Sequence, residues 1–146
     1  KQMTLDDFER AVRFLRQHAI AVRAFILLRP PFMEEQEGVE WAIRSMEYAF
    51  SVGVQCCSLI PTRPGNGALE QLHTTGLFDR PTLASMETVL EAGIEMARGR
   101  VFMDLWDVER FYECGQCGPL RRERMHRMNL SQRTAPRVHC ADEAHR

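Results

Sequence analysis

Three short apolar runs, separated by helical patterns, most constrain the fold of this chain. They cover residues 20–29, 54–61 and 100–106. The first run stops at Pro30–Pro31, and each is short enough to be a single strand. Nearly continuous apolar runs of this length are typical of strands in parallel sheets, which are covered on both faces. We therefore predict three buried parallel strands.

Amphipathic patterns with helical spacing fill the intervals between the strands. In the first of them, Leu5, Phe8 and Val12 recur on one face, and Thr4 stands where an N-cap residue is expected. A helix before or between successive short strands predicts an α/β fold built from parallel βα units with right-handed connections. The expected helices cover residues 4–18, 34–50, 68–76 and 81–98.

The order of these elements indicates part of a larger architecture. Three parallel strands make a thin sheet, and the first recognisable element is a helix rather than a strand. We expect residues 1–106 to form the C-terminal half of an incomplete TIM-like (β/α) barrel, whose other half would lie N-terminal to Lys1. The first strand would then have an unpaired edge, through which a homodimer can form.

Composition narrows the class of protein. The 146 residues are 45% apolar and 27% charged with a net charge of −1, which fits a globular domain and disfavours a strongly basic nucleic-acid binder. No apolar run approaches the ~20 residues of a membrane helix, and no signal-peptide core is visible. The five cysteines are an odd number, so we expect reduced thiols in a cytoplasmic protein without membrane contact.

The C-terminal ends of the strands are the first candidate site, because parallel α/β folds bind ligands there. The loops at 29–35 and 58–67 lie at these ends, and each carries an arginine, Arg29 and Arg63. A guanidinium suits a carboxylate or a phosphate. The alternative is that proline and glycine build tight loops whose arginines pair with glutamates. No GxGxxG fingerprint of a dinucleotide site is present.

These loops carry a family resemblance. AFILLRPPFMEEQEGVEWAIRS at 24–45 and SLIPTRPGNGALEQL at 58–72 resemble the second half of a radical S-adenosylmethionine domain. The most similar subgroup contains elongator-type and archaeosine-type tRNA-modification proteins. DLWDVERF at 104–111 and RMNLSQR at 127–133 also resemble the tail of that subgroup.

The resemblance implies an incomplete (β/α) barrel that binds a [4Fe–4S] cluster and S-adenosylmethionine and generates a 5′-deoxyadenosyl radical. The cluster ligands of the family form a CxxxCxxC motif, which this chain does not contain. They would lie outside it, and this part alone is expected to be inactive. The residues that the resemblance places around the cofactor or an anionic substrate are Leu27, Leu28, Arg29, Ile60, Pro61 and Arg63.

The C-terminal segment, residues 107–146, is expected to be a separate, irregular Cys/His appendage. Cys114, Cys117, Cys140 and His145 form the pattern C-x2-C-x22-C-x4-H, which is typical of a structural zinc site. His139 competes for the fourth position, and His126 is a weaker candidate. Another metal cluster and unligated thiols are the alternatives. The adjacent Cys56 and Cys57 would point to opposite faces of a strand, so we interpret them as buried free thiols.

The same segment contains an arginine run with two interpretations. One is a solvated basic helix, and the other is a patch that contacts RNA phosphates. The second interpretation supports an alternative function, a non-catalytic zinc-stabilised module with an RNA-binding basic tail. The arginines are Arg121, Arg122, Arg124, Arg127, Arg133 and Arg137, with Glu123 as the acid among them.

Overall fold

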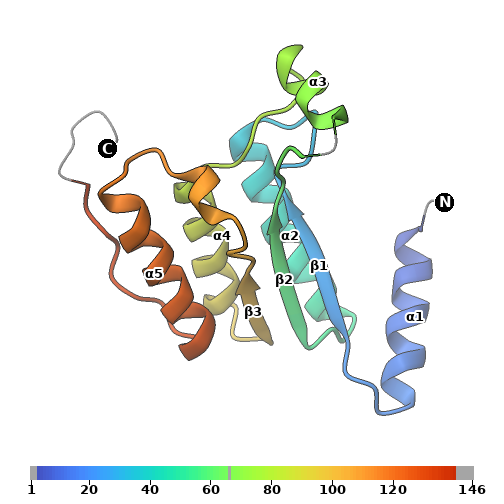
Figure 1. The fold of residues 1–146 in the computed structure, drawn as a ribbon. Coiled ribbons are helices and arrows are strands. Elements are labelled where there is room, and N and C mark those ends of the chain that lie inside the picture. Colours follow the sequence, from blue (N-terminus) through green and yellow to red (C-terminus); the bar gives the residue numbers. More distant parts are fainter. Residues whose placement is uncertain (1–2, 66, 141–146) are drawn as a thin grey trace.

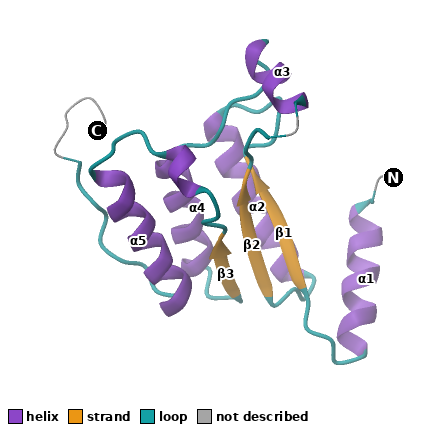
Figure 2. Cartoon of the chain, in the orientation of Figure 1, coloured by secondary structure: helices purple, strands orange, loops and turns teal. Residues whose placement is uncertain are grey.

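The predicted alternation of helices and strands is confirmed in a computed structural model, which describes residues 3–65 and 67–140 (Figures 1 and 2). None of the helices in these residues is both long and apolar enough to span a bilayer. The elements in chain order are α1 (Leu5–Gln17), β1 (Arg23–Leu28), α2 (Glu35–Ser51), β2 (Cys56–Pro61), α3 (Ala68–Thr74), α4 (Leu83–Glu95), β3 (Arg100–Met103), the 3-10 helix η1 (Val108–Phe111) and α5 (Cys117–Ser131).

The three strands form one parallel sheet in the order β1-β2-β3. Arg23 lies opposite Cys56, which lies opposite Arg100, so the strands start together at one end of the sheet. Beyond β2, Thr62 donates to the Leu28 carbonyl from its amide at 3.1 Å and from its hydroxyl at 2.8 Å. The fold is mixed α/β with an open parallel sheet, which is consistent with part of a barrel.

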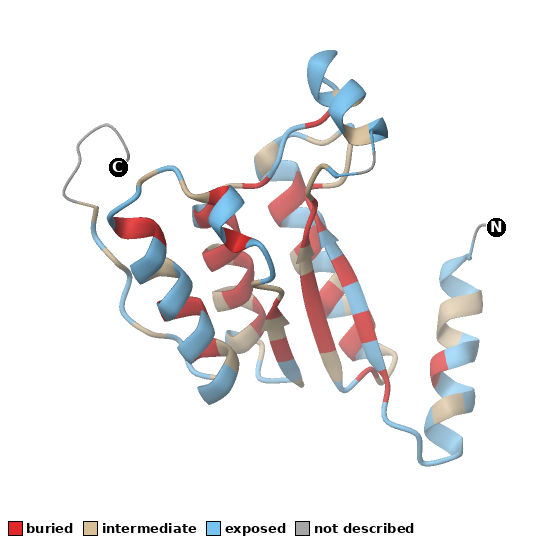
Figure 3. Cartoon of the chain, viewed as in Figure 1, coloured by how far each residue is buried: buried red, intermediate tan, exposed pale blue. Residues whose placement is uncertain are grey.

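Helices cover one face of the sheet. α2 packs against β1 and β2, and α4 and α5 pack against β3. Figure 3 shows buried residues along the strands and along the helices that cover them. Leu28, Leu59 and Met46 are fully buried between these layers. Gly93 of α4 makes the close approach of α4 to α2 and β3 possible, because a Cβ there would stand 2.7 Å from the Met46 sulfur. This interface is the hydrophobic core.

The opposite face of the sheet is uncovered within the described residues. Exposure alternates along β1, and Phe25 and Leu27 on the open face are 71% and 54% exposed. The expectation that this strand is covered on both faces is therefore wrong for this chain. The apolar run of β1 suits a strand that is covered on both faces, whereas α2, α4 and α5 cover only one face of the sheet.

α1 stands beside the free edge of β1 (Figure 1). A capping box between Thr4 and Asp7 begins this helix, as the N-cap prediction required. Its contacts run to α2: the Phe8 and Tyr48 rings are 6.2 Å apart, and the Tyr48 hydroxyl donates to the Leu5 carbonyl at 3.3 Å. Between α1, β1 and α2 lies an apolar groove of about 360 Å³.

The outer edge of β3 is closed by two side-chain amides of α5 and its C-cap. Asn129 accepts from the Met103 amide and donates to the Met103 carbonyl, both at 2.9 Å. Gln132 makes the same pair of bonds with Val101, both at 2.8 Å. Each side chain thus reproduces the bonds of a neighbouring strand.

Removing one of these amides is expected to destabilise the chain. Asn129→Ala leaves the Met103 amide and carbonyl without partners at a half-buried edge, which costs about 1–3 kcal/mol. The free energy of unfolding in urea measures the loss. Ser131→Ala is the matched control on the exposed side of α5, and we expect it to change the value by less than about 0.5 kcal/mol. Equal losses in the two variants would contradict the role of Asn129.

Residues 107–140 are more regular than the sequence indicated. They contain η1 and the 15-residue helix α5, and α5 packs against both β3 and α4. Met125 and Met128 are fully buried in the same core cluster as Leu59. The expected boundary between residues 106 and 107 therefore falls inside one hydrophobic core.

Candidate metal centre and strand-end site

Three thiols converge where α5 begins. The Sγ atoms of Cys114, Cys117 and Cys140 all lie within 4.8 Å of one another. Cys117 is buried, and the other two are partly exposed. The three cysteines of the predicted zinc pattern are thus brought together, although 22 residues separate Cys117 from Cys140 in the chain. This group can hold a metal ion.

Local geometry fixes the first two cysteines of this group. The Gly118 amide donates to the Cys114 carbonyl at 2.9 Å, which closes the turn that joins Cys114 to the helix. Gly118 is packed directly on the Tyr112 ring, and a Cβ there would lie 2.5 Å from the ring. Glycine at this position lets the CxxC turn fold against Tyr112.

The surroundings shift the pKa values of the Cys114 and Cys117 thiols in opposite directions. Backbone amides of Cys117 and Gln116 donate to the Cys114 sulfur and lower the pKa of that thiol. Burial and the neighbouring thiols raise the pKa of Cys117. Without a cation among them, three thiolates at this spacing repel one another, whereas a bound metal ion favours deprotonation of all three.

The fourth ligand of the predicted pattern is not among the described residues. His139 and His126 are exposed, and neither belongs to the set of mutually close ligand atoms. His145, the expected ligand, lies outside the described residues. Three sulfur ligands with one further ligand fit tetrahedral zinc.

The remaining cysteines do not form a metal set. Cys56 and Cys57 are consecutive residues of β2, and Cys57 is fully buried on the side that the helices cover. Burial raises the pKa of Cys57 to about 12. Cys57 is a small core side chain, as the sequence predicted.

The six residues that the resemblance placed around the cofactor divide between the two faces of the sheet. Leu27 and Ile60 are neighbours in register on the open face. Leu28 and Pro61, also a register pair, are buried on the face that the helices cover. Consecutive strand residues point in opposite directions, so Leu28 and Pro61 are removed from a ligand on the open face. Leu27 and Ile60 are the two that such a ligand can touch.

Arg29 is engaged inside the protein. It has a positive φ of 52° and is 9% exposed, and a Cβ on Gly38 would lie 2.9 Å from the Arg29 Cα. Its Nη1 donates to the Arg80 carbonyl at 2.7 Å and lies 3.4 Å from a Glu35 carboxylate oxygen. This arginine ties the loop after β1 to the start of α4, so its contacts match the alternative of arginine pairing with glutamate.

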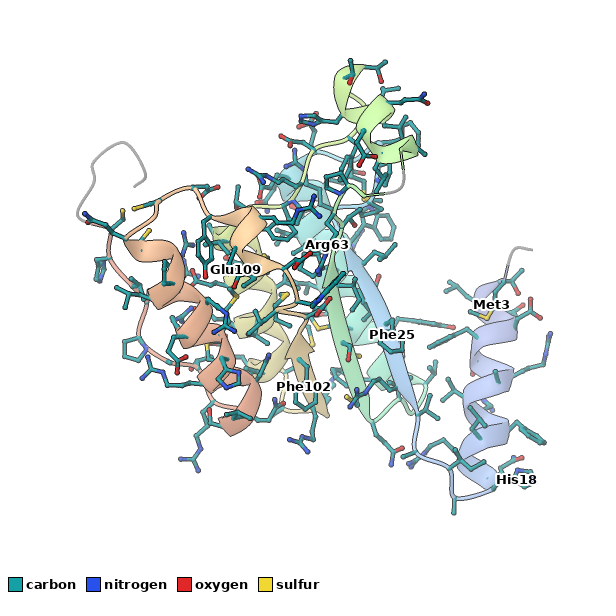
Figure 4. All side chains as sticks on the ribbon, viewed as in Figure 1. Met3, His18, Phe25, Arg63, Phe102 and Glu109 are labelled. Carbon is teal, nitrogen blue, oxygen red and sulfur yellow. The ribbon has the colours of Figure 1, made fainter. Side chains whose placement is uncertain are left out.

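Arg63 is likewise engaged, and Figure 4 shows it at the C-terminal end of β2. Its Nη2 donates to the Asp104 carboxylate at 2.7 Å, and its Nη1 donates to the Trp106 carbonyl. The guanidinium carbon is 5.4 Å from the centre of the Trp106 ring and 5.8 Å from that of Phe111. A ligand-binding role for Arg29 or Arg63 remains a prediction.

Glu35 belongs to the hydrogen-bond network of Arg29, and its shifted pKa predicts that the stability of the fold depends on pH. Burial raises the pKa of Glu35, but hydrogen bonds from Ser85 and Thr82 and the charge of Arg29 outweigh it and leave the pKa below its usual value. A depressed carboxylate pKa stabilises the fold above the unfolded value, and this stabilisation is lost as the pH falls through the folded value.

Stability is therefore expected to fall below about pH 4.5 in the wild type. Glu35→Gln should cost about 1 kcal/mol at pH 7, allowing for its partial exposure, and should flatten this part of the profile. Urea unfolding between pH 3 and 7 measures both effects. Glu37→Gln, an exposed neighbour in α2, serves as the control and should keep the wild-type profile. A profile for Glu35→Gln as steep as that of the wild type would contradict the assignment.

The arginine run is only in part the solvated basic helix of the first interpretation, and contact with RNA phosphates stays a prediction. Arg124 is 1% exposed and lies 3.1 Å from Glu87 of α4, which Arg121 also contacts at 2.7 Å. Arg137 pairs with Glu91. Half of the run is thus neutralised against α4, and Arg124 is a buried core residue rather than part of a solvated helix.

Comparison with known proteins gives weak and partial matches. The chain matches no protein-family model, and no solved structure matches it. It is 24% identical to an uncharacterized protein of Methanocaldococcus jannaschii over 140 residues, covering 90% of this chain and 38% of that protein. It is 27% identical to the archaeosine synthase subunit beta of Methanosarcina acetivorans over 95 residues, 62% of this chain and 26% of that protein.

The chain thus spans well under half the length of both curated relatives. Its similarity to the archaeosine synthase subunit is partial, and it agrees with the subgroup that the strand-end motifs resemble. The molecule is a mixed α/β chain with an open parallel sheet, a three-cysteine group that can bind a metal ion, and weak homology to an archaeosine synthase subunit.

Proposed function

We propose that this chain is part of a tRNA-modifying enzyme of the radical S-adenosylmethionine type, in which it supplies the C-terminal strands of the barrel. The weak homology to an archaeosine synthase subunit is the observation that carries the proposal. The open sheet supports it, since one face and one edge are uncovered within the described residues.

In this proposal the rest of the barrel joins the sheet at the free edge of β1. α1 lies beside that edge, and the apolar groove between them is lined by Phe8, Phe25 and Trp41. An added parallel strand would extend the sheet along β1 and cover Phe25. In this proposal the partner is the N-terminal half of the same protein. The match covers only 38% and 26% of the two relatives, which supports a longer parent protein.

The residues present do not fit the radical-generating cluster. Cys56 and Cys57 lie on opposite faces of β2, and the other three cysteines form their own group at the start of α5. No CxxxCxxC motif exists in the sequence. In this proposal the cluster ligands belong to the N-terminal half, and the present chain contributes Leu27 and Ile60 to the cofactor side of the barrel.

The three-thiol group has a structural role in the proposal. Cys114, Cys117 and Cys140 would bind zinc with His145 as the fourth ligand, and the metal would hold the returning segment against α5. Elemental analysis of chain purified without a metal-affinity column tests this. We expect about one zinc per chain, lost in Cys117→Ser and retained in Cys56→Ser. Iron in place of zinc, or equal metal contents in the two variants, would refute the zinc assignment.

The tRNA role is tested by gel retardation. The 146-residue chain should retard an unmodified tRNA transcript more strongly than a duplex DNA of similar length at about 150 mM salt. Equal retardation of both, or of neither, would count against tRNA as the substrate. The non-catalytic alternative with a basic tail is weakened by the pairing of Arg121, Arg124 and Arg137 with glutamates of α4.

The cofactor role has its own test. Equilibrium dialysis against labelled S-adenosylmethionine should detect binding by the chain joined to its N-terminal half. Leu27→Asp should weaken that binding roughly tenfold or more, because it places a carboxylate on the apolar open face. Phe14→Asp changes an exposed residue of α1 and is the control. Unchanged binding by Leu27→Asp would remove the open face from the cofactor site.

A further inference from the structure

Trp106 is held in an unusual position at the C-terminal end of the sheet. Its side chain is 71% exposed, although its backbone is fixed on both sides. The Trp106 amide donates to the Asp104 carboxylate at 3.0 Å, and its carbonyl accepts from Arg63. The next residue, Asp107, has a positive φ of 51°. A large apolar ring is thus presented to solvent by an ordered turn.

The support under this turn is a half-buried ion pair. Arg63 and Asp104 side chains are 13% and 31% exposed and are 2.7 Å apart. The Arg63 guanidinium also lies over the Trp106 and Phe111 rings. Arg63 therefore helps to position Trp106 through its hydrogen bonds to the Trp106 carbonyl and to Asp104.

Two further guanidinium groups lie beside the turn. Arg80 donates to the Arg110 carbonyl, and Arg110 donates to the Pro64 carbonyl at 3.4 Å. Both side chains are exposed, and neither forms an ion pair with a carboxylate of the described residues. Their positive charges remain available at the C-terminal end of the sheet, where Arg110 follows Trp106 by four residues. Figure 4 shows Arg63, after β2, and Glu109, in η1, at this end of the sheet.

We infer that Trp106 is a stacking platform for an unpaired base of RNA, with Arg80 and Arg110 contacting the phosphates that flank this base. An exposed aromatic face beside unneutralised arginines is the chemistry that binds single-stranded RNA. Asp107 and Glu109 interrupt the positive charge, so the surface suits one splayed base better than the continuous backbone of a duplex. The inference deepens the proposed function and rests on it for the identity of the RNA.

A second tryptophan provides a matched control. Trp41 of α2 is 47% exposed, and its ring lies 5.3 Å from the Arg44 guanidinium, so it shares the exposure and the arginine of Trp106. It lines the groove beside α1, away from the strand ends. Because the chain has two tryptophans, Trp41→Phe and Trp106→Phe each leave one fluorescent reporter.

The experiment titrates the chain with a labelled single-stranded RNA of about 12 nucleotides, within the usual range of site sizes. Trp106→Ala should weaken binding roughly 5- to 150-fold, the loss expected for one stacked base, while Trp41→Ala binds as the wild type does. Trp106 fluorescence in the Trp41→Phe variant should be quenched by the RNA, and Trp41 fluorescence in the Trp106→Phe variant should not. Arg80→Ala with Arg110→Ala should reduce the salt slope by roughly 0.7 for each phosphate that the protein no longer neutralises.

The outcomes separate this inference from the proposed function. If the wild type binds tRNA but Trp106→Ala binds equally well, the stacking role of Trp106 is overturned while the tRNA role stands. If the wild type binds neither tRNA nor the short single-stranded RNA, both are overturned. If Trp106→Ala instead changes the oligomeric state in light scattering, the ring covers a second chain, and the stacking role is again overturned.

Discussion

Arg124→Ala is expected to lower the free energy of unfolding by about 3–5 kcal/mol, the loss typical of a broken buried ion pair. Arg124 donates to the Ala135 carbonyl at 3.0 Å and the Pro136 carbonyl at 2.8 Å, and it also contacts Glu91. Its Nη1 lies 3.1 Å from Glu87 Oε1, a charge contact whose angle is not that of a hydrogen bond. Removing Arg124 leaves the Glu87 carboxylate, which is 4% exposed, with Arg121 as its remaining partner.

Urea unfolding of Arg124→Ala, of a control variant and of a double-mutant cycle tests this prediction. Arg122→Ala is the control: Arg122 is 45% exposed and 3.6 Å from Glu109, so its removal should cost less than about 0.5 kcal/mol. Arg124→Met combined with Glu87→Met removes both buried charges and should cost less than the sum of the two single changes. Additive losses, or a loss below about 1 kcal/mol in Arg124→Ala, would contradict a buried charge network.

Zinc is expected to change the stability of the chain by an amount that grows with its free concentration. A ligand that binds the folded state alone adds about 1.4 kcal/mol for each tenfold rise above its dissociation constant. The metal would join the start of α5 to Cys140, so it resists separation of the returning segment from the helix. The effect should disappear in Cys140→Ser.

Thermal unfolding in zinc buffers of graded free concentration measures this slope. Cys56→Ser keeps the three-thiol group and should reproduce the wild-type slope. A strong chelator should lower the melting temperature of both proteins to that of Cys140→Ser. A flat response in the wild type would show that the three thiols are not a metal site in the folded chain.

The sequence predicted the element order because each element carries its own local signal. The Thr4 cap and the apolar face of residues 4–18 specify α1, and the three apolar runs specify the strands. The ends were less accurate. α4 begins at Leu83 and not at Pro81, because the Thr82 side chain caps it by accepting from the Ser85 amide.

The ion pairs between α5 and α4 could not be predicted, because each helix carries only one charge of each pair. Arg124 resembled a solvated residue because its neighbours are charged. The complementary acids are in a different helix. Glu87 and Glu91 are four residues apart on one face of α4, and they face Arg121 and Arg124, which are three residues apart on one face of α5. The convergence of the three cysteines could be predicted, since metal-ligand spacing is itself a long-range signal.

The two edges of the sheet have a consequence for symmetry. Side-chain amides of Asn129 and Gln132 occupy the bonding groups of Val101 and Met103, so β3 offers no edge to another chain. Head-to-tail growth needs two complementary edges, and here one of them is closed. Copies that pair through the strand edges of the described residues can do so only β1 to β1, about a twofold axis, which ends at a pair. The amide caps therefore exclude an endless fibre of sheets joined edge to edge, while they leave the edge of β1 free.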